Sequence, residues 1–201
     1  MRFKPALPSG QVLQLAGVSA LFGWVIGLAL SFTPAWHIVE LKVFDLLTVA
    51  KPPKQSLPIS IVGIDEASFT QLGLRWPWPR EVHAQLVDRL AKAGAAVIAF
   101  DVLFTEESTP ADDDALARAI KAAGNVVLAA DSEYHETASV KGWLRVDPIP
   151  KLTMAGATTG LLTVELDDDT IVRQVPDADD AFWRQTIKTL IRARPNMIQE
   201  P

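Results

Sequence analysis

The longest uninterrupted apolar stretch of the chain lies near its start, from Val12 to Phe32. After Arg2 and Lys4 no charged residue occurs until Glu40, so every face of a helix in this stretch would be apolar. At about 1.5 Å per residue such a helix covers roughly 30 Å, the thickness of the hydrocarbon core of a bilayer. The pattern therefore predicts a membrane-spanning helix.

The ends of this stretch predict how it is used. It exceeds the roughly 7–15 apolar residues of a cleavable signal peptide, and no small-x-small cleavage site follows it, so we expect an uncleaved anchor. Arg2 and Lys4 favour a cytoplasmic N-terminus. One face of the helix carries small residues at a regular spacing: Ser19, Gly23, Gly27 and Ser31. Either this face packs two helices closely in a homodimer, or it reflects the ordinary composition of membrane helices.

Beyond the anchor, short apolar runs alternate with helical periodicity. Residues 36–48 predict an amphipathic stalk helix, and proline-rich residues 51–58 predict a linker. The predicted strands are Ile59–Asp65, Ala95–Asp101 and Asn125–Ala130, and the predicted helices between them are Glu81–Ala95 and Asp112–Ala123. Alternation of this kind predicts an α/β fold with a mainly parallel sheet.

The central strands define the expected core. Nearly inaccessible residues should include Ile61, Ile64, Val97, Ile98, Val127 and Leu128, covered by the helix that bears Leu86 and Leu90. Towards the C-terminus we expect a strand pair, residues 158–166 and 170–176, around an acidic turn at Asp167–Asp169. An amphipathic helix over Asp179–Arg194 should follow.

These elements predict a division of the chain into five parts. They are a cytoplasmic N-terminus (1–11), a transmembrane helix (12–34), a stalk and linker (35–58), an extracytoplasmic domain (59–194) and a tail (195–201). The tail is expected to continue into a further region of a longer protein.

The composition and the motif content argue against several classes of function. The net charge is −5, with no cluster of Lys and Arg outside the termini, which disfavours nucleic-acid binding. The chain has no cysteine. Phosphate-binding, zinc-protease, serine-hydrolase and CxxC motifs are all missing from the sequence, so we expect no catalytic site, cofactor or metal.

Two aspartates are candidate binding residues. Asp65 and Asp101 each end a predicted parallel strand at its carboxyl end, where open α/β sheets place ligand crevices, and Glu66 adds to the acidity. Either they share a ligand or cation, or each one caps the turn after its strand. If one of these carboxylates is buried it needs a cationic partner, and Arg80 and Arg173 are the candidates.

An aromatic and basic segment follows the first predicted strand. Trp76, Trp78 and Arg80 lie on a proline-rich loop and form either a ligand-binding patch or a hydrophobic lid over the sheet. His83, one turn into the next helix, is either a ligand contact or a packed histidine. The acidic run at Asp112–Asp114 is expected to start a helix, favoured by the helix dipole, rather than to bind a metal.

The segments IDEASF, WPWPR and GAAVIAFDVLF, in this order and spacing, resemble the second-type CHASE domain, a sensory extracellular domain of bacterial receptors. The resemblance runs from about Trp36 to Pro176. Its usual D-G-x-x-R-x-V-P segment occurs as Asp169–Pro176, with Thr170 in place of glycine, a departure that affects the turn.

The resemblance implies an extracytoplasmic sensor in the bacterial cell membrane, acting through an effector elsewhere: a nucleotide cyclase, diguanylate cyclase or kinase. Its ligand, a small molecule or a protein, is not identified by any residue here. Two other functions remain open on sequence alone. One is a membrane-anchored, metal-dependent hydrolase using Asp65, Glu66 and Asp101, and the other is a non-catalytic interaction module.

Overall fold

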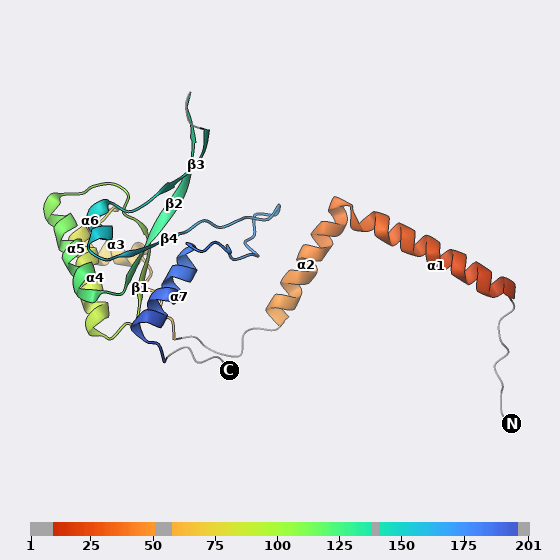
Figure 1. Cartoon of the computed structure of the whole chain (residues 1–201), viewed down its shortest axis with the longest axis horizontal. Coiled ribbons are helices and arrows are strands. Elements are labelled where there is room, and N and C mark those ends of the chain that lie inside the picture. Colours follow the sequence, from red (N-terminus) through yellow and green to blue (C-terminus); the bar gives the residue numbers. More distant parts are fainter. Residues whose placement is uncertain (1–9, 51–57, 138–140, 197–201) are drawn as a thin grey trace. The chain divides into compact units, whose positions relative to one another are not determined.

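The structure, a computed structural model, describes residues 10–50, 58–137 and 141–196. The chain divides into two compact units, residues 1–63 and 64–201, and each is described by itself (Figure 1).

The first unit consists of two helices, α1 (Gly10–Ser31) and α2 (Pro34–Ala50). Thr33 joins them: its hydroxyl donates to the carbonyl of Leu30 at 2.6 Å, and its own carbonyl accepts from the amide of Trp36 at 3.1 Å. Both predicted helices are confirmed. Within α1, Gln14–Ser31 is long and apolar enough to cross a membrane, and it is the one such helix in the described part of the chain.

The second unit alternates helices and strands, which confirms the predicted α/β class. Its elements in order are α3 (Glu66–Leu72), α4 (Arg80–Lys92), β1 (Ile98–Leu103), α5 (Pro110–Ala123), β2 (Val126–Glu136), β3 (Lys141–Val146), α6 (Pro150–Met154), β4 (Thr158–Leu161) and α7 (Phe182–Ala193).

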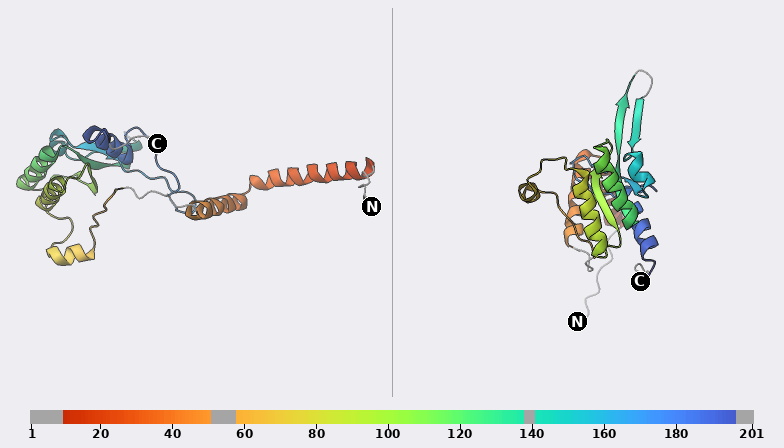
Figure 2. Two further views of the ribbon diagram at one scale, coloured as in Figure 1. Left: turned by 90° about the horizontal axis from the view of Figure 1, so that it is seen from below. Right: turned by 90° about the vertical axis from the view of Figure 1, so that its left-hand side faces the viewer.

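Strand β2 is the centre of the sheet. Its first half pairs in parallel with β1 on one side and with β4 on the other. Its second half, from Asp131 onwards, pairs antiparallel with β3 to form a two-stranded ribbon that leaves the body of the sheet (Figures 1 and 2). This ribbon is absent from the sequence-based prediction.

Local signals set the helix boundaries in this unit. The hydroxyl oxygen of Thr109 accepts from the amide of Asp112 at 3.2 Å, and Pro110 occupies the first turn of α5, where its missing N–H costs nothing. Gly124 ends the same helix with φ 70°, a conformation that glycine adopts without strain. The acidic run therefore starts a helix, as predicted.

Helices cover the two faces of the sheet. Helices α4 and α5 lie side by side on one face, while α7 contacts β2 and β4 (Figures 1 and 2). The core between them contains Ala84, Val87, Ile98, Phe100, Phe104, Leu116, Ala119, Ile120, Val126, Leu128, Ile149 and Leu152. The start of α7 lies so close to β4 that a Cβ atom built on Gly160 would be 2.5 Å from the Cα of Phe182.

The first predicted strand is wrong in this structure. Residues 59–65 form no strand, and Ile61 and Ile64 are 92% and 36% exposed instead of buried. Ile98, Val127 and Leu128 are buried as predicted, and Val97 is half-buried. The β-branched composition of residues 59–65 favours an extended segment, but composition does not specify a partner strand.

The predicted C-terminal strand pair is also wrong. Only its first four residues form a strand, β4, which pairs with β2 and not with residues 170–176. Helix α7 confirms the predicted last helix in slightly shorter form, although two of its apolar residues, Ile187 and Ile191, are 40% and 45% exposed.

Candidate functional site, an aromatic cluster around His83

Four of the predicted site residues come together in the second unit. His83 lies among rings from the loop before α4 and from β1 and the loop after it, which we call the aromatic cluster. Its ring centroid is 5.3 Å from Phe104, 6.0 Å from Phe100, and 6.1 Å from both Trp76 and Trp78. Phe69 of α3 completes the aromatic cluster, 5.5 Å from Trp78 in an edge-to-face arrangement.

The spacing of residues on α4 explains why a histidine and an arginine lie in this interior. Arg80, His83, Ala84 and Val87 are all buried, and they follow one another at helical i, i+3, i+4 and i+7 intervals. The stripe that faces the sheet thus carries two polar side chains at its N-terminal end. Both need partners in the fold, because burial without a hydrogen bond is costly.

Arg80 finds these partners on α5 and the loop before it. Its guanidinium forms an ion pair with Asp113 and donates to the backbone carbonyl of Glu106. The two side chains are only 9% and 4% exposed. Asp113 also accepts from the amide of Ser108 at 3.3 Å, and the Arg80 guanidinium lies 5.6 Å from the ring of Phe104. The pair therefore connects α4, α5 and residues 104–108.

The two tryptophans differ in exposure. Trp78 is 9% exposed, and its indole N–H is buried without a hydrogen-bond acceptor in the described residues. Trp76 is 48% exposed. It is therefore the ring of the aromatic cluster that is most accessible to a ligand or partner. Each predicted alternative holds for one residue. Trp78 is packed, as expected for a hydrophobic lid, and Trp76 is exposed, as expected for a ligand-binding patch.

Burial sets the protonation of His83. Desolvation lowers the pKa of the imidazole below its usual 6.5, and the nearby positive charge of Arg80 lowers it further. His83 is 2% exposed, so the ring is a neutral, packed side chain at neutral pH rather than an accessible acid or base. The aromatic cluster thus connects α3, α4 and β1, and none of its side chains is a nucleophile.

This burial predicts how stability depends on pH. Because the folded state binds the His83 proton less readily than the unfolded chain, stability should fall as the pH decreases below about 6.5, by at most about 1.4 kcal/mol per pH unit. Urea unfolding of the full chain in detergent at pH 7.5 and 5.5, followed by tryptophan fluorescence, measures the change. His83→Gln should flatten this dependence, with His135→Gln as the control, and an unchanged slope in His83→Gln would contradict the assignment.

The predicted aspartate site does not assemble as expected. Asp65 follows no strand and instead caps α3, where its carboxylate accepts from the amide and hydroxyl of Ser68 at 2.9 and 2.8 Å. These hydrogen bonds lower the pKa of Asp65. Glu66 is exposed in the first turn of α3, and Asp101 is exposed on β1. Neither aspartate is the buried carboxylate partner of Arg80, which is Asp113.

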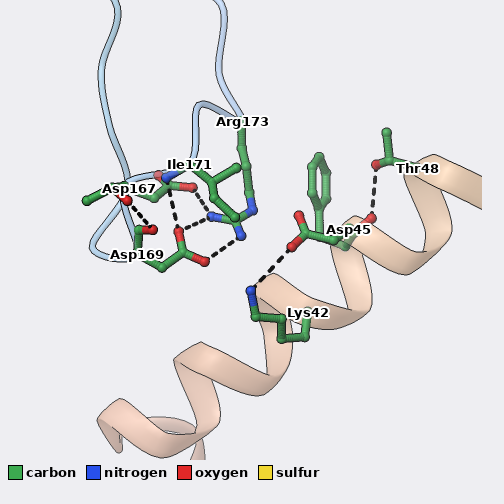
Figure 3. A network of polar contacts seen from close by, with 9 residues as sticks. Lys42, Asp45, Thr48, Asp167, Asp169, Ile171 and Arg173 are labelled. Atoms are coloured by element: carbon green, nitrogen blue, oxygen red, sulfur yellow. Dashed lines mark hydrogen bonds and ion pairs between the residues drawn. The ribbon is translucent and has the colours of Figure 1, made fainter.

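Arg173 lies in a separate turn. Its guanidinium contacts Asp167 at 2.8 Å and donates to both carboxylate oxygens of Asp169 at 2.7 Å, with the Arg173 side chain only 5% exposed (Figure 3). Thr170 has φ 64°, the left-handed region that glycine normally occupies. The turn therefore has the backbone conformation that a glycine would adopt, although threonine occupies the position.

The small residues predicted to pair two helices all lie on α1. The Ser19 and Ser31 hydroxyls donate to the carbonyls of Leu15 and Leu28 within the helix. A Cβ built on Gly23 or Gly27 meets no atom within 4 Å. This face is open in a single chain, and dimerisation stays a prediction.

The ribbon carries an aromatic pair that sequence analysis missed. Tyr134 and Trp143 face each other across β2 and β3, 5.4 Å apart, and are 46% and 70% exposed. Arg145 holds the base of the ribbon through Asp147 at 2.8 Å, Asp180 at 2.5 Å and Thr159 at 3.1 Å.

Asp113 is the other residue that sequence analysis missed. The acidic run Asp112–Asp114 predicts only a helix start, yet Asp113 shares one buried stripe of α5 with Leu116 and Ile120. A charged residue in a core-facing position predicts burial, and burial predicts a partner. The same reasoning on α4 selects Arg80.

In the described part of the chain, no three His, Cys, Asp or Glu side chains are placed to hold a metal ion together. The hydrolase hypothesis therefore gains no support from the geometry of Asp65, Glu66 and Asp101.

Comparison with known proteins adds one finding. The model of the CHASE2 domain matches residues 20–196, from the middle of α1 to the end of the described chain. No curated protein and no solved structure is significantly similar to the chain. Since the match covers most of the 201 residues, the chain belongs to the CHASE2 family, the sensory extracellular domains of signalling receptors.

Proposed function

We propose that the chain is the extracytoplasmic sensing part of a receptor in a bacterial cell membrane. The observation that supports this most directly is the continuity of α1, which can cross a membrane, with a domain of an extracellular sensory family. Arg2 and Lys4 before the helix favour a cytoplasmic N-terminus, and this supports an extracytoplasmic location of the second unit.

The proposed signal is a shift between two states of the domain that differ in affinity for a small molecule or a protein. The proposed contacts are Trp76, the exposed ring of the aromatic cluster, and Asp65 and Glu66 at the exposed start of α3. The buried Arg80, Asp113 and His83 belong to the structural interior of the domain rather than to the proposed contact surface. A homodimer through Ser19, Gly23, Gly27 and Ser31 would pass the shift across the membrane to a cyclase, diguanylate cyclase or kinase outside these 201 residues.

A second candidate is an interaction module that binds a protein partner and no small ligand. The exposed Tyr134 and Trp143 pair favours it, because tyrosine and tryptophan supply much of the binding energy of protein interfaces. The two candidates differ in the contact surface: the ribbon for the interaction module, the surroundings of Trp76 for the sensor.

The topology of the chain tests the proposed location. Alkaline phosphatase, which is active only outside the cytoplasm, should be active when fused after Pro201, and a green fluorescent protein fused there through the general secretion route should be dark. The expectation follows from one span with a cytoplasmic N-terminus.

Fusions of the same two reporters before Met1 are the control and should give the opposite pattern. A fluorescent C-terminal fusion together with an inactive phosphatase would overturn the proposed location.

A further inference from the structure

The indole N–H of Trp78 is buried and has no hydrogen-bond acceptor among the described residues. Trp78 is 9% exposed, and its Nε1 atom is inaccessible to solvent. A buried N–H without an acceptor loses its hydrogen bonds to water and gains none in exchange, so such groups are rare in folded proteins. A phenylalanine ring would pack in the interior without this loss. Packing alone therefore does not account for a tryptophan at this position.

Aromatic rings surround this donor. The ring centroid of Phe69 lies 5.5 Å from that of Trp78 at an interplanar angle of 72°, and the centroid of Trp76 lies 6.0 Å away at 64°. The face of an aromatic ring accepts an N–H only weakly. Sites for small molecules are lined mainly by hydrophobic and aromatic side chains and contain a few polar groups that orient the ligand. The surroundings of Trp78 have this composition, with the indole N–H as the orienting donor.

One of these rings belongs to an element that packs little against the domain. Helix α3 carries Phe69, and none of its seven residues is buried, whereas α4 has four buried residues. Both views in Figure 2 show α3 standing apart from α4, α5 and the sheet. Phe69 is also not part of the core cluster. Elements that bury little apolar surface open at a low cost in free energy, so Phe69 can leave Trp78 while the core stays packed.

We propose that Trp78 is the polar contact of a ligand site that α3 keeps closed. The structure shows the closed form, in which the Phe69 ring packs against the indole. In the open form a planar aromatic ligand takes the place of Phe69 and accepts a hydrogen bond from Trp78 Nε1 through a ring nitrogen or a carbonyl oxygen. This inference rests on the proposed sensor function and names the class of small molecule for it.

The charges around the aromatic cluster favour an uncharged ligand. The guanidinium of Arg80 lies 5.6 Å from the ring of Phe104, but its charge is compensated by Asp113 within the fold. The Trp78 donor is neutral and lies among rings, where an ion would lose its hydration. Because the ligand binds only the open form, its binding shifts the domain towards that form, which gives the proposed signal its two states.

Two probes of the same shape test the hydrogen bond. Quinoline and naphthalene both consist of two fused six-membered rings, but only quinoline has a ring nitrogen that accepts a hydrogen bond. Each probe is titrated into the full chain in detergent at pH 7.5, with the six tryptophans labelled with ¹⁵N for NMR. The Trp78 signal is the one that Trp78→Phe removes. Quinoline should move this indole proton downfield, the direction of hydrogen-bond formation, and naphthalene should not.

The affinities of the two probes give a second readout. The hydrogen bond should make quinoline bind more tightly than naphthalene. Trp78→Phe should reduce this preference by roughly 2- to 10-fold, the contribution of one hydrogen bond. Partition of the probes into detergent is the same for every variant, so it cancels from the comparison.

Substitution of Phe69 tests the closure by α3. In Phe69→Ala no ring has to leave Trp78, so both probes should bind about threefold or more tightly than to the unchanged chain. A residue that only lined an open site would have the opposite effect, because its truncation would weaken binding. Leu72→Ala is the matched control on the same helix: Leu72 is 48% exposed, and its truncation should leave both affinities unchanged.

An equal preference for quinoline in the unchanged chain and in Trp78→Phe would overturn the site, and so would an affinity that is unchanged or lower in Phe69→Ala. Shifts confined to the signal of Trp24 in α1 would show that the probes bind only near the detergent, and they would overturn it too. Should Trp78→Phe fail to fold, the Phe69→Ala affinities decide the outcome. These measurements do not depend on the side of the membrane, so failure of the site and failure of the proposed location are distinguishable.

Discussion

Replacing Asp113 with alanine is expected to destabilise the second unit by about 3–5 kcal/mol. The substitution leaves the guanidinium of Arg80 buried, with its charge no longer compensated by a carboxylate. Removing one partner of a buried ion pair costs far more than the pair itself contributes, because an unpaired charge is poorly tolerated in the interior. Urea unfolding of the full chain in detergent measures the loss.

Neighbouring residues provide the controls for this prediction. Asp114→Ala removes an adjacent acid whose ion pair with Lys151, at 2.7 Å, is on the surface, so its effect should be much smaller. The double variant Arg80→Met with Asp113→Leu should recover much of the stability, because both charges are replaced by apolar groups. A loss below about 1 kcal/mol in Asp113→Ala, or a double variant as unstable as the single one, would contradict the role given to this pair.

Ile98→Ala is expected to destabilise the same unit by about 2–5 kcal/mol. Ile98 is 4% exposed on β1 and belongs to the core cluster with residues of α4, α5 and β2. Truncation removes buried methyl groups and leaves a cavity that packed neighbours fill only in part. The free energy of unfolding from the same urea titration measures the effect.

The same substitution at an exposed isoleucine is the control. Ile171 is 41% exposed, and Ile171→Ala should cost much less than Ile98→Ala. If Ile98→Ala lost under about 1 kcal/mol, this part of β1 would lie at an exposed position rather than against the helices.

The order of helices and strands could be predicted where the signal is local. Helix α4 shows it well: its apolar spacing, Pro79 before it and Gly94 after it are all in the sequence, and the helix runs from Arg80 to Lys92. Strands β1 and β2 could be predicted because each begins in a short apolar run that comes directly after a helix. Periodicity along the chain is sufficient for these elements.

Pairing between distant segments could not be predicted in the same way. Residues 59–65 and 170–176 have strand-like composition, but composition does not specify a partner strand, and neither is a strand in the structure. The ribbon shows the reverse case. Residues 131–146 mix charged, aromatic and glycine residues without clean alternation, and the pairing of Tyr134 with Trp143 depends on the register of two strands.

The candidate site was predicted in part for the same reason. Trp76, Trp78, Arg80 and His83 are close in the sequence, so their clustering needed only one loop and one helix turn. The contact of Arg80 with Asp113 links residues 33 positions apart and depends on how α4 packs against α5. The stripes on each helix indicate that both charges are buried, but only the fold shows that they meet.

The length of β2 has a mechanical meaning. One strand of 11 residues, about 36 Å at roughly 3.3 Å per residue, runs from the middle of the sheet to the outer end of the ribbon. Among the described residues, its inner half pairs with β1 and β4, and its outer half pairs with β3 alone. A partner that bent the ribbon would thus act on β2, whose backbone continues without a break into the buried centre of the domain.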